Sequence, residues 1–528
     1  MNTTARAERP SALPAPAAGA AGYQPPAATV QPPRTPWLGI GIVAAAAFGV
    51  EMAVSGRYGY VRDELYFLAA GHHLAWGYVD QPAITPLLAR LSAILFGNTL
   101  VGLRVIPALA LAALVVLTAS MSRLLGAGRT GQVLAALAAA TCGEYLGAMH
   151  ELTTATPDFV FWALTLYLVL RLLTSQDPRW WLAIGGCAGV ASEAKWNIAF
   201  LAASLAAGFL ATGGRPLLRS RYLLFGCLIA AALAAPDLIW QAAHGWPSID
   251  VFRSLQTQAG HNRATYWIGQ FLYAGPVLAP VWVAGAIWSV RSREAVRFRA
   301  VGIACVIAIV LQFVLGGKPY YPGGAYTFLF AAGSVPLERR LAARKSRTSR
   351  TSRFGPAARM AVAMLVGGLI AAPITLAVLP ARALHTVPLQ KINYDLGEEI
   401  AWPKEVALVA REYHALPAVQ RQHTTILTGN YGEAGAIDRY GPGLGLPQAY
   451  SGDNNFWLWG PPPAADTSAI VVNGDPAFLR REFANVRRVA TFWNGLGVSD
   501  DEQGAPIYLA TGLKSSWAHS WAAFRNYS

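Results

Sequence analysis

Long apolar segments recur through the first 380 residues of this chain, and few soluble folds can bury so many of them. A helix that spans a bilayer needs about 20 mostly apolar residues. Hydrophobic residues make up 54% of the 528 residues and charged residues only 13%, whereas soluble domains carry about 25% charged residues. The chain is therefore predicted to be a mainly α-helical, polytopic membrane protein. Eleven segments are candidates for spans: 37–54, 99–122, 130–148, 158–174, 180–194, 196–212, 222–236, 266–290, 299–316, 324–337 and 359–380.

The positive charge of the chain lies in short links between these segments. A net charge of +14 could indicate a nucleic-acid-binding protein, but the basic residues form no single patch, so we exclude that class. They fall in five alternate links, which the positive-inside rule assigns to the cytoplasm. This predicts a multi-pass protein of the plasma (inner) membrane with a cytoplasmic N-terminus and an extracytoplasmic C-terminus. The basic residues are Arg123, Arg129, Arg171, Arg179, Arg215, Arg219, Arg221, Arg291, Arg293, Arg297, Arg299 and eight more from Arg339 to Arg359.

Composition divides the chain into three parts. Residues 1–36 are rich in Pro and Ala and are expected to form a disordered cytoplasmic tail. Residues 37–380 form the membrane domain. Residues 385–528 are more polar, with short strand-like runs such as TTILTGN and AIVVNG, and predict a small extracytoplasmic α/β domain. The four cysteines lie in apolar segments without metal-ligand spacing, so they indicate neither a disulfide nor zinc.

The stretch RDELYFLAAGHHLAWGYVDQP, at 62–82, places three acids between the first two apolar segments. Because an acid at the bilayer centre costs about 2.5–3.5 kcal/mol, this stretch must lie outside the hydrocarbon. We expect two helices along the membrane surface, with Asp63, Tyr66 and His73 near one face. The Asp63–Glu64 pair can either stabilise a helix start or carry out chemistry, and the residues alone leave both readings open.

Other ionisable residues lie in different loops on the same predicted side of the membrane. They are Asp158, Lys195, His244 and Lys318. Helix capping by Asp158 and snorkelling by the lysines are the structural alternatives. Together, however, carboxylates can deprotonate a hydroxyl group or hold a divalent cation, while lysines and a histidine can neutralise a phosphate. This set predicts group transfer from a lipid-phosphate carrier.

Several of these motifs, in order, resemble those of bacterial membrane glycosyltransferases of the protein-mannosyltransferase and aminoarabinose-transferase group, glycosyltransferase family 39. The motifs are RDE with HLAWGYVDQP, TPDFVFWALTLYLVLR, PDLIWQAAHGWPS and GKPYYPGGAYTFLFAAG. The resemblance covers residues 37–380. It implies the type C glycosyltransferase fold with about 11 transmembrane helices. It also implies a polyprenyl-phosphate-linked sugar donor, membrane lipids around it, an extracytoplasmic acceptor (protein, lipid or cell-envelope glycan) and an inverting mechanism.

The resemblance also implies roles for individual residues. The acidic pair of the family matches Asp63 and Glu64, with the aspartate as catalytic base, and the acid of its TPD motif matches Asp158. A divalent metal ion is left open, with Glu64 and Asp158 as candidate ligands. One departure is Asp237, where the family pattern leads us to expect Asn. The residues expected to bind the donor phosphate are Lys195, His244, Lys318, Tyr320 and Tyr321.

Two other functions are alternatives to a transferase. A lipid-carrier flippase or transporter predicts ionisable residues deep within spans and paired broken helices in two repeated halves, and the sequence shows no internal repeat. A non-catalytic glycan receptor would not need so many spans. The outer domain is expected to shape acceptor choice in a transferase, or to bind glycans in a receptor, with SGDNNFWLWG at 451–460 as a sugar or peptide surface.

Overall fold

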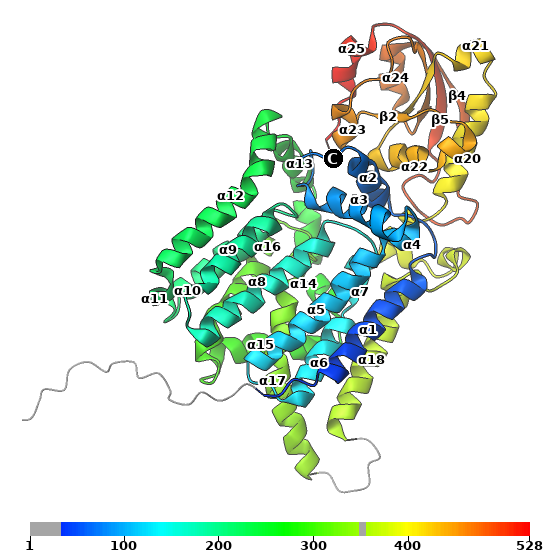
Figure 1. Cartoon of the computed structure of the whole chain (residues 1–528). Helices are drawn as coiled ribbons and strands as arrows, with labels where there is room; N and C mark the ends of the chain where they lie inside the picture. The colour runs from blue at the N-terminus through cyan, green and yellow to red at the C-terminus, as the bar shows by residue number, and fades with distance from the viewer. Residues whose placement is uncertain (1–32, 348–354, 528) are drawn as a thin grey trace, which may run out of the picture. The chain divides into compact units, whose positions relative to one another are not determined.

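The computed structural model describes residues 33–347 and 355–527, so most of the tail expected at 1–36 lies outside the described residues. From Trp37 to Thr375 the described chain is a succession of helices joined by short links (Figure 1). In order they are α1 (Trp37–Val54), α2 (Arg62–His72), α3 (Ile84–Phe96), α4 (Leu100–Leu103), α5 (Val105–Leu124), α6 (Arg129–Ala140), α7 (Gly143–Ala148), α8 (Ala155–Ser175), α9 (Trp180–Ser192), α10 (Ile198–Leu210), α11 (Arg215–Leu218), α12 (Arg221–Ala243), α13 (Pro247–Gln256), α14 (Ala259–Ala274), α15 (Ala279–Arg291), η1 (Val296–Phe298), α16 (Arg299–Leu315), α17 (Ala325–Arg347) and α18 (Pro356–Thr375).

Every expected span falls on a helix or a broken pair of helices, but the lengths differ from the prediction. Within the described ranges, six helices are long and apolar enough to cross a membrane, or seven if one bent pair counts as a span. Helices α9 and α10 have only 13 residues each. At 1.5 Å per residue each is about 20 Å long, which is less than the roughly 30 Å of a hydrocarbon core. The helical class is confirmed, although several expected spans are too short to cross alone.

The span expected at 266–290 is the clearest difference. It consists of α14 and α15, which are bent by 105° relative to each other. Gly275, between them, has a φ of +97°, a conformation that favours glycine. Pro276 follows and has no N–H to continue a helix. The apolar run continues across this corner, so hydropathy alone merges the two helices.

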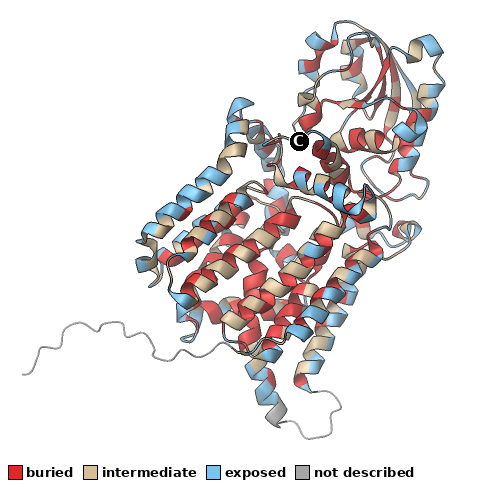
Figure 2. Cartoon of the chain, in the orientation of Figure 1, coloured by how far each residue is buried: buried red, intermediate tan, exposed pale blue. Residues whose placement is uncertain are grey.

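The central helices are closely packed. Figure 2 shows buried residues concentrated on the helices in the middle of the bundle, while α12 is mostly exposed. Helix α9 packs along α12, where a Cβ added at Gly185 would lie 2.1 Å from the carbonyl oxygen of Gly226. Such small residues let helix backbones approach closely in membrane proteins, where van der Waals packing drives association.

The chain after α18 forms short helices and one small mixed sheet, as the fold class predicted. The strand order is β2-β1-β3-β5-β4, with β2, β1 and β3 parallel and β5 antiparallel to both β3 and β4. The elements are η2 (Ala381–His385), η3 (Leu389–Lys391), α19 (Asp395–Glu398), α20 (Trp402–His414), α21 (Ala418–Arg421), β1 (Thr424–Thr428), α22 (Tyr431–Tyr440), η4 (Pro442–Leu444), β2 (Ala449–Ser451), α23 (Asn454–Leu458), β3 (Ser468–Val472), α24 (Pro476–Glu482), β4 (Phe483–Thr491), β5 (Pro506–Leu513), α25 (Trp517–Ser520) and η5 (Trp521–Phe524).

Helix α2 shares a hydrophobic core with this C-terminal region. Its Leu65 and Phe67 belong to the same buried cluster as Ile426 of β1 and Ala434 of α22. A Cβ added at Gly435 of α22 would lie 2.9 Å from the backbone of Leu65, so the two helices are in direct contact. The helix that carries the Asp63–Glu64 pair is therefore positioned by the C-terminal region as well as by the bundle.

Candidate functional site

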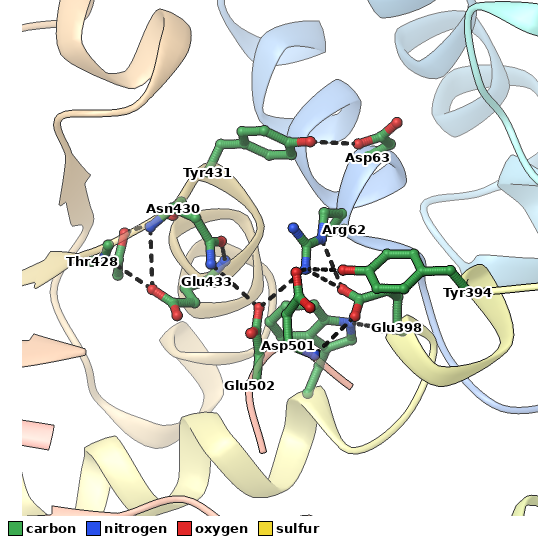
Figure 3. A network of polar contacts seen from close by, with 12 residues as sticks. Arg62, Asp63, Tyr394, Glu398, Thr428, Asn430, Tyr431, Glu433, Asp501 and Glu502 are labelled. Carbon is green, nitrogen blue, oxygen red and sulfur yellow. Dashed lines mark hydrogen bonds and ion pairs between the residues drawn. The ribbon is translucent and has the colours of Figure 1, made fainter. Parts of the chain in front are cut away.

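Asp63 lies in the first turn of α2 and points toward the C-terminal region. Its Oδ1 accepts a hydrogen bond of 2.8 Å from the hydroxyl of Tyr431, at the start of α22 (Figure 3). The Tyr431 ring also contacts Tyr66, with ring centroids 4.9 Å apart. Burial, and then the neighbouring Asp63 carboxylate, raise the pKa of Tyr431 well above its usual value, so the phenol remains a hydrogen-bond donor.

Asp63, Tyr66 and His73 lie along one face of α2, as expected from the sequence. Asp63 and Tyr66 both meet Tyr431, while Tyr66 and His73 both contact Trp459; the His73 and Trp459 rings are stacked 4.5 Å apart. That face is covered by the C-terminal region. A distant acid also belongs here, because the hydroxyl of Tyr66 donates to Asp80 at 2.8 Å. Burial raises the pKa of Asp80 to about 7.

Arg62 is held by what we call the Arg62 cluster, formed with Tyr394, Glu398, Asp501 and Glu502. Its guanidinium is ion-paired with Glu398 and lies 2.8 Å from Asp501 (Figure 3). The same group donates to the hydroxyl of Tyr394 at 2.8 Å. Since Arg62 precedes Asp63, this cluster fixes the start of α2 against the C-terminal region.

The Glu64 side chain is fully buried, and both of its carboxylate oxygens accept hydrogen bonds. Arg104 donates to both of its oxygens, at 3.1 and 2.9 Å. The backbone N–H groups of Val61 and Leu152 add bonds of 3.1 and 3.2 Å, the first of which is the helix-capping contact considered above. Glu399 also accepts from Arg104, at 3.3 Å. We call Glu64, Arg104, Glu399 and His150 the Arg104 cluster.

A second group of charges, which we call the lysine cluster, comes from two loops and the start of α8. It contains Lys195, Lys318, Tyr320, Tyr321 and Asp158. The Nζ of Lys195 lies 4.6 Å from the ring centroid of Tyr321 and 5.6 Å from that of Tyr320. The Nζ of Lys318 lies 6.0 Å from the centroid of the Tyr320 ring. In the described part of the chain, neither ammonium group is within 4.0 Å of a carboxylate oxygen.

Lys195 interacts electrostatically with two of the acids, Asp158 and Asp63. Burial lowers its pKa from the usual value. Asp158 opposes that change, Lys318 adds to it, and Asp63 opposes it. Three other residues expected from the sequence therefore lie within electrostatic reach of Lys195, although the four come from separate parts of the chain. The ring contacts also make this arrangement different from a lysine that merely snorkels to the membrane surface.

Asp158 is buried in the first turns of α8. Its Oδ2 accepts a 2.8 Å hydrogen bond from the side chain of Asn197, whereas its Oδ1 has no hydrogen-bond partner within the described residues. Asn197 also donates to the carbonyl oxygen of Tyr321 at 2.9 Å, so one amide joins Asp158 to the tyrosine loop. The residue at the N-cap of α8 is Thr154, so Asp158 is not the N-cap of this helix.

Two residues of the PDLIWQAAHGWPS motif lie elsewhere. His244 is exposed at the end of α12, where its ring stacks on Trp240 at 4.0 Å. Among the described residues no hydrogen bond or ring contact joins it to the lysine cluster. Asp237, which departs from the family pattern, is buried and accepts a 2.8 Å bond from Trp196. Trp196 follows Lys195, so Asp237 supports the Lys195 turn.

Glu64, one of the two candidate ligands for a divalent ion, already has other partners. Its oxygens accept from Arg104 and two backbone N–H groups. Among residues 33–347 and 355–527, no group of three or more His, Cys, Asp or Glu side chains is placed to hold a metal ion. Asp158, the other candidate, keeps one oxygen without a hydrogen-bond partner in the described residues.

The SGDNNFWLWG stretch also has a structural use. Asn455 accepts from the backbone of Val79 at 2.7 Å, and Phe456 is buried in the core beneath α2. The side chain of Trp457 donates to Trp521 at 2.9 Å. The polar and aromatic residues of this stretch therefore bind the first loop and the end of the chain, which leaves little open surface for a sugar.

Sequence reasoning missed the partners that come from far along the chain. Tyr431 and Glu398 contact α2 from more than 300 residues away, and Arg104 lies at the start of an apolar span. Asp395 was also missed: burial, and then Asp63, raise its pKa to about 6. The motif NYGEAGAIDRY contains Tyr431, but the sequence does not tell where that tyrosine points.

Comparison with known proteins gives a family match over part of the chain and a fold match over most of it. The family model of dolichyl-phosphate-mannose-protein mannosyltransferases matches residues 80–240. ArnT from Cupriavidus metallidurans bound to undecaprenyl phosphate superposes with a TM-score of 0.57 at 15% identity, over 90% of this chain and 98% of that one. The apo state of the same protein gives a TM-score of 0.56 at 14% identity, over 89% and 97%. No curated protein sequence matches this chain.

These similarities confirm the expected resemblance. At 15% identity the structural match shows the fold, and the chain has an ArnT-like fold over nearly its whole length. The family match independently covers the first loop from Asp80 and the motifs around Asp158, Lys195 and Asp237. With its apolar helices, the chain is a multi-pass membrane protein.

Proposed function

We propose that this protein is an inverting glycosyltransferase that takes a sugar from a polyprenyl-phosphate donor and transfers it to an acceptor outside the cytoplasm. The observation that carries the proposal is the lysine cluster. Two ammonium groups from distant loops converge on one tyrosine pair without a carboxylate ion pair of their own. Such a site suits a phosphate that brings the missing negative charge.

The fold and family matches support the chemical class of the donor. The family that matches residues 80–240 uses, by its name, dolichyl-phosphate mannose, and the ArnT structure of the same fold holds undecaprenyl phosphate. Dolichyl phosphate and undecaprenyl phosphate are both polyprenyl phosphates.

In the proposed reaction, Asp63 acts as the base. An acceptor hydroxyl attacks the anomeric carbon from the face opposite the phosphate, a new C–O bond forms, and the bond from the anomeric carbon to the phosphate oxygen breaks. The hydroxyl proton passes to the Asp63 carboxylate, and the polyprenyl phosphate leaves with the bonding electron pair. Lys195 and Lys318 stabilise the charge that develops on the leaving phosphate. Tyr431 and the Arg62 and Arg104 clusters hold Asp63 in place.

The direct test is transfer by the purified protein in proteoliposomes, supplied with a panel of polyprenyl-phosphate sugars and analysed by mass spectrometry. We expect one donor to give a product with the anomeric configuration inverted. Lys318→Ala should lose that product, while Lys514→Ala, which changes an exposed lysine of the C-terminal region, should keep it. Retention of configuration, or equal turnover by Lys318→Ala, would contradict the proposal.

The proposal requires the site to face outward. The basic links support this orientation, because they predict a cytoplasmic N-terminus. Cysteines placed at the exposed positions Ala464 and Arg293, in a Cys227→Ala background, report the two sides. A membrane-impermeant maleimide should label the first in intact cells and spare the second. The opposite pattern would reverse the orientation and the site with it.

One observation favours a flippase as the alternative. The α14–α15 pair, bent by 105°, is the kind of broken helix that transporters use to line a path. A fluorescent polyprenyl-phosphate sugar in proteoliposomes distinguishes the two functions. Movement between leaflets without product would favour the flippase, whereas product formation without movement favours the transferase.

A further inference from the structure

The C-terminal sheet contains a topological switch point. Strand β1 lies between β2 and β3 and is parallel to both. After β1 the chain passes to α22, which packs on the face of Ile426, and after β3 it passes to α24, which packs on the opposite face with Leu427 and Val471. The two connections leave the carboxyl ends of neighbouring strands in opposite directions. In open α/β sheets ligands bind in the crevice that such a divergence leaves.

A cavity of about 360 Å³ lies at this place. Thr428 at the end of β1 with Gly429 after it, and Asn473 and Gly474 after β3, line it together with α24 and the end of the chain. A Cβ added at Gly429 would lie 2.6 Å from the carbonyl oxygen of Asn473, so glycine is what lets the two turns approach. The C-terminal segment closes one side, because Asn526 donates from its backbone to Gly452 at 2.8 Å.

The lining carries two arginines whose charge is not neutralised locally. Arg481 lies over the ring of Phe478 at 5.3 Å, and Arg525 lies over the ring of Trp457 at 5.5 Å. Within the described part of the chain, neither forms an ion pair. Asp475 supplies the carboxylate of the lining, but it accepts from the backbone N–H groups of Ala477 and Phe478 at 2.9 and 3.2 Å.

Two aromatic side chains, Phe478 and Phe524, also line the cavity, beside the aliphatic Leu427, Val471 and Leu479. Phe478 and Phe524 meet edge to face, with centroids 4.8 Å apart. Aromatic rings beside guanidinium groups bind a flat apolar face and an anion at the same time. The volume holds roughly one or two sugar rings, since pockets for whole drug-sized ligands begin at about 300 Å³.

We infer that this cavity is a second ligand site, which binds an acidic saccharide of one or two units through Arg481 and Arg525. The acid can be a carboxylate or a phosphate on the sugar, because a guanidinium binds both in the same bidentate way. If the proposed transferase function is right, the natural occupant is an acidic part of the acceptor, held away from the lysine cluster. Binding itself does not depend on that function, so the two ideas fail separately.

The test measures binding to the full-length protein in detergent by isothermal titration calorimetry, without any donor. The probes are a hexuronate disaccharide, a hexose 1-phosphate, the matched neutral disaccharide and inorganic phosphate. At least one acidic sugar should bind ten times or more tightly than the neutral sugar and inorganic phosphate; which one binds identifies the acid. Equal binding of neutral and acidic sugars, or tight binding of inorganic phosphate alone, would overturn the inference.

Variants locate the binding. Arg481→Gln and Arg525→Gln should each weaken the acidic sugar about tenfold or more, as expected for loss of a hydrogen bond to a charged group. Arg480→Gln is the matched control, since it is the exposed neighbour on α24 and does not line the cavity. Ala523→Phe, at an exposed lining position, should block binding while leaving the melting temperature unchanged. Wild-type affinity in both arginine variants would show that the sugar binds elsewhere.

Discussion

The Arg104 cluster and the lysine cluster both gather charges near the same end of α2, but they do so in opposite ways. In the Arg104 cluster the guanidinium donates to Glu64 and Glu399, and all three side chains are buried. In the lysine cluster the two cations face tyrosine rings, and no carboxylate comes within ion-pair distance in the described residues. A cation that already has its counterion holds the fold together. A cation that faces only rings still has its charge available for a ligand.

Asp63 lies between these two arrangements. Its neighbours Arg62 and Glu64 are held by ion pairs, while its own carboxylate has one hydrogen bond, to a tyrosine. The fixed neighbours orient the backbone, and the lightly bound carboxylate remains able to accept a proton. The comparison therefore predicts losses of stability from one set of variants and losses of turnover from the other.

The largest expected effect is on turnover by Asp63→Asn. Asn keeps the size and one acceptor for Tyr431 but cannot take a proton, which should reduce the rate by about 10²–10⁴-fold. The measurement is turnover per folded protein at saturating donor. The helix itself should lose little, since Asp63 is not the N-cap of α2 and a first-turn carboxylate contributes only about 0.3–1 kcal/mol through the helix dipole. Near-normal turnover would return Asp63 to a structural role and move the search for a base to Asp158.

Arg104→Met should affect stability instead. It leaves Glu64 buried without its cation, and removing one member of a buried ion pair costs about 3–5 kcal/mol. Thermal unfolding in detergent should show a clearly lower midpoint. Arg253→Met is the matched control, because its ion pair with Asp250 is exposed and should not move the midpoint. An unchanged midpoint for Arg104→Met would mean that the cluster does not hold the fold.

Lys195→Ala and Lys318→Ala should show the reverse pattern. Each is expected to weaken donor binding or turnover by about 2–4 kcal/mol if it contacts a desolvated phosphate. The unfolding midpoint should change little, since neither lysine has a counterion to leave behind. Donor titrations beside melting curves separate the two effects. If both variants lost stability but kept wild-type kinetics, the difference between the clusters would disappear.

The sequence could predict the parts of this site that depend on local patterns, but not the parts that depend on contacts between residues far apart in the chain. Apolar length located the helices, and the residues at loop ends, such as Lys195 and Lys318, could be expected together because they fall on one side of the membrane. The corner at Gly275 was hidden because the apolar run continues through it. Tyr431 could not be paired with Asp63, because 368 residues separate them and only the docking of α2 on α22 brings them together.

The next largest effect is expected on the pH dependence of folding stability, which comes from buried acids of the C-terminal region. Burial raises the pKa of Glu399 to about 8 and that of Glu502 to about 7, from an ordinary value of 4.5. The folded state thus binds protons that the unfolded state releases. This contribution is fully present below pH about 4.5 and is lost as the pH rises through about 7 to 8.

Melting curves between pH 5.5 and 8.5 should therefore show the midpoint temperature falling as the pH rises. The free energy of unfolding should decrease by an amount on the order of 1–3 kcal/mol. Glu502→Gln should flatten part of the slope, because the amide does not titrate. Asp250→Asn, at an exposed acid, should leave the slope as it is. Stability that increased with pH across this range would show that the acids are ionised and paired in the folded protein.

The smallest expected effect comes from Tyr431→Phe, which tests whether the C-terminal region takes part in the chemistry. The change removes one hydrogen bond of 2.8 Å to Asp63 and keeps the ring that packs on Tyr66. Losing such a bond should cost about 1 kcal/mol, or roughly a fivefold lower kcat. The melting temperature should stay close to wild type, and KM for the donor should not change, because the lysine cluster is untouched. Tyr440→Phe, on the same helix but without contact to Asp63, is the control that should leave kcat unchanged. If Tyr431→Phe behaved like that control, the C-terminal region would hold α2 in position without tuning its aspartate.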